Sequence, residues 1–459
     1  MCLALLSVSG FLGRGGFVSR LPFRIGGWLA TSFLCFLLVS CFAVHAWCLQ
    51  IVALNQSPVP SWFSSLHFVP MLEVSPYFYR GPVWFSVLSQ VLALFEVVFL
   101  VLLWFAIGSS PWKSRIGLFV GSSLAIMCIL AVLSRGMTSF DSYAYVGDAL
   151  LGTRCYFTGG IPFERSFAVI NHFWGYPFVR CPYGPVWLEF MHVASSMFAT
   201  VDFGVMFMRF VGVASLVGFC VGCFVLGAPL RFVAVFALDP AVIEQFVVDA
   251  HNDLICVTLL VFARIFASRG RVTLAIGLCV LAVLSKAIFV VFALLVFVRV
   301  LVPRVAFFSW ISVIGVSVIL SVVFGGVPYL ESVKAASVLN PMMSGVAPIL
   351  RISTFSGLSC LLVCLFRGRV GPSSPWSAVS FGSAVFPWYL SWGIPFCILD
   401  FDSSLPFLSL FPVSVLLLST SYAPSPLWSV IAVVSLTTAL FSTYLVFRDR
   451  VVHLRSRTT

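Results

Sequence analysis

Charge is what this sequence has least of. Asp, Glu, Lys and Arg make up 9% of its 459 residues, whereas about 25% is usual in soluble globular proteins. Hydrophobic residues make up 61%, and the mean hydropathy is +1.11. The shortage of charge extends along the whole chain and excludes a sizeable soluble domain. We expect an all-α fold, a polytopic transmembrane helical bundle of about twelve to fourteen spans, because each span needs about 20 apolar residues.

Regular cysteine spacing, a cleavable leader and internal repeats are also lacking. The 14 cysteines lie mostly inside hydrophobic segments, which predicts small buried side chains and not a metal-binding framework. Cys155 and Cys181 share one polar stretch, and a disulfide between them is left open. The first apolar segment has no small-residue cleavage site, so we expect no removable signal peptide. A transporter or flippase would favour internal repeats, and none is convincing here.

The net charge of +11 comes from 26 basic and 15 acidic residues. The basic residues fall mainly in short loops between apolar runs, the pattern of cytoplasmic loops in multi-pass proteins of the cell membrane. We therefore expect the lipid bilayer as a partner and no nucleic acid. Arg14, Arg20 and Arg24 place the start of the chain in the cytoplasm.

The apolar runs predict the order of spans and loops. A lysine at mid-bilayer is costly, so the run 272–303 is predicted to be a helical hairpin with Lys286 at its outer tip. Residues 186–200 are predicted to be an amphipathic helix at the interface. The other spans are predicted at about 28–53, 83–107, 116–134, 206–226, 231–248, from 253 to 264, at 305–325, and as five further spans to the end of the chain. The outer loops between them are predicted at about 54–82, 135–204 and 326–350.

A polar stretch from Arg135 to Trp187 interrupts the apolar pattern, and Asp141 is its focus. Asp141 follows a predicted span by a few residues, so its carboxylate would lie at the membrane surface. There it could act as a general base that takes a proton from a sugar hydroxyl. Equally, it could cap the amino end of an interfacial helix. A second polar group, His251-Asn252-Asp253, stands at the head of a predicted span and could likewise be a helix cap.

Several motifs in fixed order resemble the first outer loop of polyprenol-phosphate-mannose-dependent mannosyltransferases of the GT-C superfamily. They are Asp141-x-Tyr-x-Tyr-x-Gly, then Gly-Ile-Pro-Phe, Trp174 and Tyr183-Gly-Pro-Val-Trp. The segments around Asp239-Pro240, His251-Asn252-Asp253, Lys286 and Pro387-Trp-Tyr-Leu-Ser-Trp recur in similar order. The resemblance covers roughly residues 130–400 and is nearest to bacterial, actinobacterial-type enzymes. It implies one membrane domain over 1–459, with extra spans in 1–115, a catalytic module in 116–305 and further spans in 306–459.

The resemblance implies an inverting transfer of mannose from polyprenyl-phosphate mannose to a cell-envelope glycan or glycolipid at the extracytoplasmic face. Asp141 would activate the acceptor hydroxyl, on the side of the sugar opposite the phosphate. The departing phosphate needs cations, and the candidates are Lys286, Arg154, Arg180 and Arg351. His251, Asn252 and Asp253 would hold the donor phosphate or its sugar hydroxyls. A metal on His251, Asp253 and Asp249 matches no strong ligand template, so no cofactor is expected.

Several alternatives stay open. Tyr143, Tyr145, Trp174, Tyr183 and Trp388 could stack on sugar rings or form an interfacial aromatic belt. The chain could instead carry lipid-linked sugars across the membrane, or use another lipid-linked sugar as donor.

Four other acidic residues are expected to have structural roles. Glu96 and Asp239, deep in predicted spans, are expected to pair with polar side chains inside the protein. Glu244 is expected to share a helix face with His251. Glu331 and Lys334 are expected to be a solvated loop pair.

Overall fold

The structure is a computed structural model that describes residues 27–53, 83–109, 113–134, 141–158, 160–174 and 180–338. Every regular element within these ranges is helical, so the protein has the expected all-α, polytopic membrane fold. The predicted loop 54–82, the Asn340-Pro341 turn and all predicted spans beyond residue 351 lie outside the described residues. The long helices are α2 (Gly27–Ala53), α4 (Val83–Ser109), α5 (Lys113–Leu133), α9 (Val201–Val225), α12 (Asp253–Ser268), α13 (Val272–Ser285), α14 (Phe289–Val300) and α15 (Pro303–Phe324).

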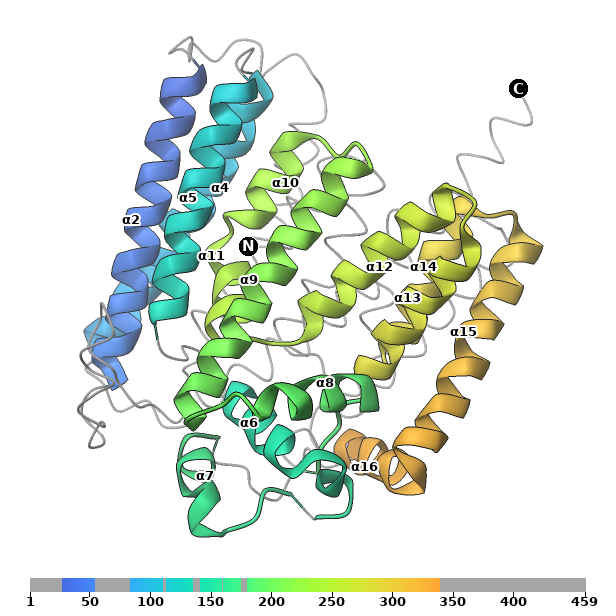
Figure 1. The fold of residues 1–459 in the computed structure, drawn as a ribbon. Helices are drawn as coiled ribbons and strands as arrows, with labels where there is room; N and C mark the ends of the chain where they lie inside the picture. Colours follow the sequence, from blue (N-terminus) through green and yellow to red (C-terminus); the bar gives the residue numbers. More distant parts are fainter. Residues whose placement is uncertain are drawn as a thin grey trace.

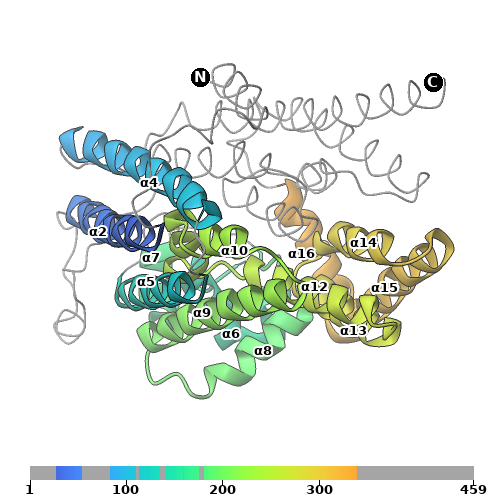
Figure 2. The same cartoon turned by 90° about the horizontal axis from the view of Figure 1, so that it is seen from above.

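Four stretches among the described helices are long and apolar enough to cross a membrane. They are Trp28–Ala46 in α2, Ser114–Leu133 in α5, Val201–Val225 and Pro303–Phe324. At 1.5 Å per residue, such lengths match the hydrocarbon core of a bilayer, about 30 Å. Figures 1 and 2 show α2, α4 and α5 grouped on one side and α12 to α15 on the other, with α9 between them. These helices confirm four predicted spans.

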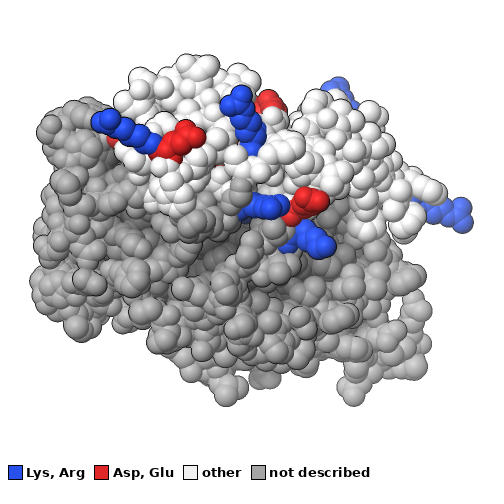
Figure 3. All heavy atoms as spheres, turned by 90° about the horizontal axis from the view of Figure 1, so that it is seen from below, with Lys and Arg blue, Asp and Glu red and all other residues white. Residues whose placement is uncertain are grey.

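Short helices form a layer across one end of the long ones (Figure 1). They are α6 (Asp141–Leu151), α7 (Ala168–Trp174), α8 (Pro185–Ser195) and α16 (Gly326–Val338). With 11 residues, α8 is too short to span a bilayer. The predicted helix in 186–200 is therefore present up to Ser195, and its position at the membrane interface stays a prediction. Seen from below, this layer carries Lys and Arg as well as Asp and Glu (Figure 3). We call α6, α7, α8 and α16, with the turns that join α6 to α8, the interfacial layer.

The predicted span 231–248 is wrong, because the chain breaks there into three short pieces. These are α10 (Leu230–Ala237), α11 (Pro240–Ile243) and a π-helix, Glu244–Val248. Pro240 has no amide hydrogen to continue α10, and the Asp239 carboxylate accepts a hydrogen bond from the Ala241 amide at 2.9 Å. Asp239 thus caps a new helix instead of extending the old one. The chain then bends by 106° between the piece Pro240–Val248 and α12.

The structure also tests the predicted hairpin at 272–303 and the predicted loop at 326–350. The hairpin at 272–303 is confirmed, since α13 ends at Ser285, α14 begins at Phe289 and Lys286 lies in the turn between them. The predicted loop 326–350 is wrong in its first part, because α16 covers Gly326–Val338. Glu331 and Lys334 are exposed on α16, so they are solvated as predicted but lie on a helix and not in a loop.

Candidate functional site

Asp141 is the first residue of α6, and its carboxylate faces the imidazole of His251. The distance between Asp141 Oδ2 and His251 Nδ1 is 3.3 Å, and the side chains are 30% and 1% exposed. The carboxylate is therefore open on one side and backed by a buried histidine on the other. This arrangement joins two expectations for Asp141, since it begins an interfacial helix and also presents a reachable carboxylate.

Lys286 meets the second acid of the group. Its Nζ donates a hydrogen bond to Asp253 Oδ1 at 2.7 Å, with the lysine side chain 17% exposed and the aspartate fully buried. Asp253 begins α12, and Asn252 occupies the N-cap position but makes no capping bond with its side chain. The side-chain amide of Asn252 (Nδ2 and Oδ1) and Asp253 Oδ2 are buried without a hydrogen-bond partner in the described structure. Buried polar atoms are normally satisfied, so this corner suits a polar ligand better than a simple helix cap.

Tyr145 connects the two pairs. Tyr145 lies one turn after Asp141 on α6, and its hydroxyl accepts a long hydrogen bond of 3.5 Å from the backbone N–H of Asn252. Burial raises the pKa of the Tyr145 hydroxyl well above its usual value, and the nearby charges of Asp141 and Asp253 raise it further. A phenol that stays neutral between two carboxylates can donate its proton as a hydrogen bond to them or to a ligand.

Two aromatic rings pack against the ring of Tyr145. The rings of Tyr145 and Tyr183 meet edge to face with centroids 4.7 Å apart, and Trp187 packs on Tyr145 at 5.7 Å. Tyr143, Tyr145 and Tyr183 are all buried, so they do not form an aromatic belt facing lipid. Tyr143 lies in a separate apolar cluster with Ile161 and Phe167, so the structure does not bring it to the group around Tyr145.

His251 owes its position to a strained turn. Ala250 has φ of 57°, a left-handed conformation that costs a residue with a Cβ about 1–2 kcal/mol. The π-helix ends at Val248, and the His251 amide donates back to the Gln245 carbonyl at 3.0 Å. His251 therefore lies beyond the helix that carries Glu244. The prediction that these two residues share a helix face is wrong.

Gly184 fixes the Tyr-Gly-Pro-Val-Trp motif against the lysine turn. Its amide donates to the Ser285 carbonyl at 2.9 Å. A Cβ at Gly184 would lie 1.9 Å from the Leu284 carbonyl oxygen, so only glycine allows this approach. The motif thereby holds Tyr183 and Trp187 beside the residue that precedes Lys286.

Gly147 joins two other motifs within the interfacial layer. A Cβ there would lie 2.6 Å from Ile161 Cδ1. The glycine that ends the Asp-x-Tyr-x-Tyr-x-Gly motif thus makes room for the isoleucine of Gly-Ile-Pro-Phe. The glycine of one motif and the isoleucine of the other are therefore required by the way the two segments pack together.

Arg209 is a residue that sequence reasoning missed. It lies buried on α9, and its Nε donates to the Val248 carbonyl at 3.0 Å. Its Nη1 donates to the carbonyls of Val132, at 3.1 Å, and Ser134. One guanidinium thus ties the end of α5, which leads to Asp141, to the π-helix, which leads to His251. The available signal was an arginine inside an otherwise apolar span, since such residues normally face the protein interior.

The remaining predicted cations are not brought to this group by the described contacts. Arg154 is exposed on the 3-10 helix Gly152–Tyr156, and Arg180 is half-buried just before Cys181. Arg351 and Trp388 lie outside the described residues.

Buried cysteines and one mixed cluster complete the inventory of possible metal ligands. All nine cysteines that the structure describes are buried and free. The seven that lie on the long helices confirm the expected packing role. Among the described residues, Asp148, Cys155 and Cys181 have ligand atoms within 4.8 Å of one another. The predicted candidates His251, Asp253 and Asp249 do not form such a group in that part of the chain.

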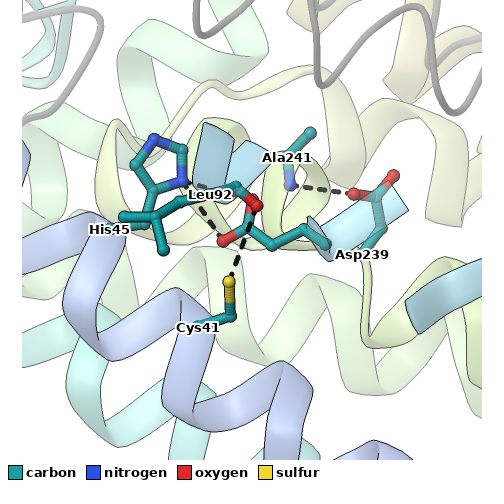
Figure 4. A network of polar contacts seen from close by, with 6 residues as sticks. Cys41, His45, Leu92, Asp239 and Ala241 are labelled. Carbon is teal, nitrogen blue, oxygen red and sulfur yellow. Dashed lines mark hydrogen bonds and ion pairs between the residues drawn. The ribbon is translucent and has the colours of Figure 1, made fainter. Parts of the chain in front are cut away.

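A second carboxylate–imidazole pair lies away from this site. His45 Nδ1 on α2 is 3.2 Å from both oxygens of Glu96 on α4. Figure 4 shows His45 beside the Cys41–Leu92 contact, with Asp239 and Ala241 on the neighbouring segment. The pair is buried. The expected internal pairing of Glu96 is confirmed, and Asp239 pairs with a backbone amide instead of a side chain.

Comparison with known proteins gives one match. A family profile described as MptA_B family, alpha-(1->6)-mannopyranosyltransferase, N-terminal domain, matches residues 40–303, which is more than half of the chain. No curated protein and no solved structure matches the chain. The matched range contains Asp141, His251, Asp253 and Lys286.

Proposed function

The chain belongs to the MptA_B family of alpha-(1->6)-mannopyranosyltransferases, and we propose that it moves a mannosyl residue from polyprenyl-phosphate mannose to a hydroxyl of a cell-envelope glycan or glycolipid. The reaction takes place at the extracytoplasmic face of the cell membrane and inverts the anomeric carbon. By the name of the family, the linkage formed is α-(1→6). The protein is a membrane-embedded mannosyltransferase of the GT-C type, and the donor, the acceptor and the orientation are the proposed parts.

One observation carries the proposal. Asp141 with His251, and Asp253 with Lys286, come from separate stretches of the chain and meet around Tyr145 at the interfacial layer. A carboxylate and an amine at the membrane surface are the two groups that transfer from a lipid phosphate requires.

Asp141 serves as the general base. Its carboxylate is partly open and takes the proton of the acceptor hydroxyl as that oxygen attacks the sugar. The imidazole of His251 lies 3.3 Å from the other side of the carboxylate and orients Asp141. A positioned base of this kind contributes about 10²- to 10⁴-fold to the rate.

Lys286 serves the leaving phosphate. Its ammonium neutralises the charge that develops on the phosphate as the bond to the sugar breaks, while Asp253 holds the lysine in place. The buried, unsatisfied amide of Asn252 is available for a sugar or phosphate oxygen. The cavity behind His251, lined also by Met208 and Ile255, measures only about 10 Å³, room for about one water. The sugar therefore binds on the open side of Asp141 and Lys286.

The helix break before His251 also resembles the broken helices of transporters. The segment Pro240–Val248 and α12 meet at 106°. Membership of a transferase family favours transfer, and an assay that follows both movement and covalent transfer of the sugar separates the two functions.

The decisive experiment uses purified protein in liposomes with synthetic polyprenyl-phosphate mannose and a short α-mannoside acceptor. We expect an α-(1→6)-linked product by nuclear magnetic resonance, and none when a sugar nucleotide replaces the lipid donor. Transfer from the sugar nucleotide alone, or movement of the lipid donor across the bilayer without any product, would overturn the proposal.

Orientation is tested with single added cysteines. Arg154 is exposed in the interfacial layer and Arg269 is exposed at the opposite end of α12. In intact cells, a membrane-impermeant maleimide is expected to label Arg154→Cys, and to label Arg269→Cys only after lysis. Ser142 is buried and is unsuitable as a labelling position. The reverse labelling pattern would place the site at the cytoplasmic face.

A further inference from the structure

Two cysteines of the interfacial layer lie in contact away from the Asp141 group. Cys155 lies on the 3-10 helix Gly152–Tyr156, and Cys181 lies two residues before Tyr183. Both are almost fully buried. Their sulfur atoms and a carboxylate oxygen of Asp148 lie within 4.8 Å of one another.

Two hydrogen bonds anchor the segments that carry these cysteines. The Tyr156 hydroxyl donates to the Tyr183 carbonyl at 2.9 Å. From α16, the Ser332 hydroxyl donates to the Cys181 carbonyl at 2.6 Å. The residue after Cys155 and the carbonyl of Cys181 are therefore both held by hydrogen bonds. Because the sulfur atoms lie within 4.8 Å of each other, rotation of the side chains can bring them toward the length of an S–S bond, about 2 Å.

The two cysteines enclose one loop of the interfacial layer. Residues 155–181 contain Gly-Ile-Pro-Phe and α7. One end of this loop follows the helix that carries Asp141 and Tyr145, and the other end leads into Tyr183 and Gly184. A covalent link at its base would hold the Tyr183 ring under Tyr145 and restrict the unfolded chain.

We propose that Cys155 and Cys181 form a disulfide that locks the base of this loop. The oxidant is a disulfide-bearing thiol oxidoreductase on the same side of the membrane. The two thiols lose two electrons and two protons as the S–S bond forms, and the disulfide of the oxidoreductase takes them up to become a dithiol. The proposal rests on the extracytoplasmic placement of the interfacial layer in the proposed function, because disulfides persist in oxidising compartments.

Metal coordination is the competing use of the same three side chains. Structural zinc sites have four protein ligands, and among the described residues only Asp148 joins the two cysteines. Three ligands require a fourth position that is open to water or substrate, whereas both cysteines here are closed off from solvent. These facts favour the disulfide.

The direct test quenches thiol exchange in native membranes with acid, then unfolds the protein at neutral pH in the presence of N-ethylmaleimide and digests it with trypsin. Trypsin releases Cys155 in peptide 155–165 and Cys181 in peptide 181–209. We expect these peptides as one linked mass that separates after reduction. Two alkylated peptides would overturn the disulfide. Thiols that react only after a chelator is added, with no linked mass, would overturn it in favour of a metal.

A second test compares wild type with Cys155→Ser, Cys181→Ser and the double variant. A reductant is expected to lower the melting midpoint of wild type by about 3 °C and to leave all three variants unchanged. Cys256→Ser is the control, since Cys256 is a buried cysteine on α12 and this variant should keep the full response to reductant. A wild-type midpoint that does not respond to reductant would contradict the lock. Mannosyl transfer without a linked peptide would sink the disulfide and leave the proposed function intact.

Discussion

Two carboxylate–imidazole pairs of nearly the same length occur in this protein, and their surroundings give them different roles. Asp141 and His251 are 3.3 Å apart with the carboxylate 30% exposed, whereas Glu96 and His45 are 3.2 Å apart with the carboxylate fully buried. The same chemical groups are open in one place and enclosed in the other. Access, not the identity of the pair, therefore separates a candidate base from an internal ion pair.

The difference comes from where each acid lies on its helix. Glu96 is in the middle of α4 and is covered by α2, where a pair mainly avoids the cost of a lone buried charge. Asp141 begins α6, so its side chain projects from a helix end at the interfacial layer. The open pair is expected to control activity and the enclosed pair to control stability.

Asp141→Asn tests the open pair and should have the largest effect. We expect mannosyl transfer to fall about 10³-fold, equal to about 4 kcal/mol, because the amide cannot accept the proton. The melting midpoint should change little, since the side chain is partly exposed and asparagine also suits a helix start. Initial rates with both substrates saturating provide the measurement. Unchanged transfer in a folded variant would remove Asp141 from the role of base.

Glu96→Ala tests the enclosed pair. Removing one partner leaves His45 buried without its carboxylate, and we expect a loss of about 3 kcal/mol in stability. Thermal unfolding in detergent measures this loss. Glu96→Gln is the matched control, because it keeps the hydrogen bond and the volume. Activity per folded molecule should stay within about twofold of wild type, and a larger fall would mean that the enclosed pair also serves the reaction.

Lys286→Ala tests the pair that Lys286 forms with Asp253. With the ammonium removed from the donor phosphate, KM for the lipid donor should rise about 30-fold, or about 2 kcal/mol, while KM for the acceptor stays nearly constant. Lys286→Arg should recover part of the loss because the positive charge returns. Equal changes in both constants would indicate that Lys286 only supports the hairpin turn.

Asp148 adds a third acid, which is enclosed in the interfacial layer. Burial raises the pKa of its carboxyl to about 7, above the usual value of 3.8. The folded state therefore binds more protons than the unfolded state between these values, and stability falls as the pH rises. Between pH 5 and 7 this loss is about 2 kcal/mol. Asp148→Asn should remove that part of the pH dependence, and a parallel slope in both proteins would contradict the assignment.

The sequence alone determined the membrane class, most helix positions in the first two thirds of the chain and the residues to watch. Hydropathy and helix length are local properties, so α2, α5 and α15 could be placed without a fold. The cost of a lysine in hydrocarbon was enough to predict the hairpin at Lys286. Composition patterns also singled out Asp141 and His251-Asn252-Asp253, but not which of them would meet.

Only the tertiary structure decided those meetings. Tyr145 and Asn252 are 107 residues apart in sequence, and Lys286 and Asp253 are 33 apart. Their contact depends on how helices pack, which no local pattern encodes. The same holds for Arg209, whose donors reach three distant carbonyls. The break at Asp239-Pro240 could be found by weighting proline above hydropathy, but its 106° bend depends on the surrounding helices. In a chain with so few charged residues, the sequence of each apolar run determines where that run lies relative to the membrane. The partner of a buried polar group is instead decided by which helices pack around it.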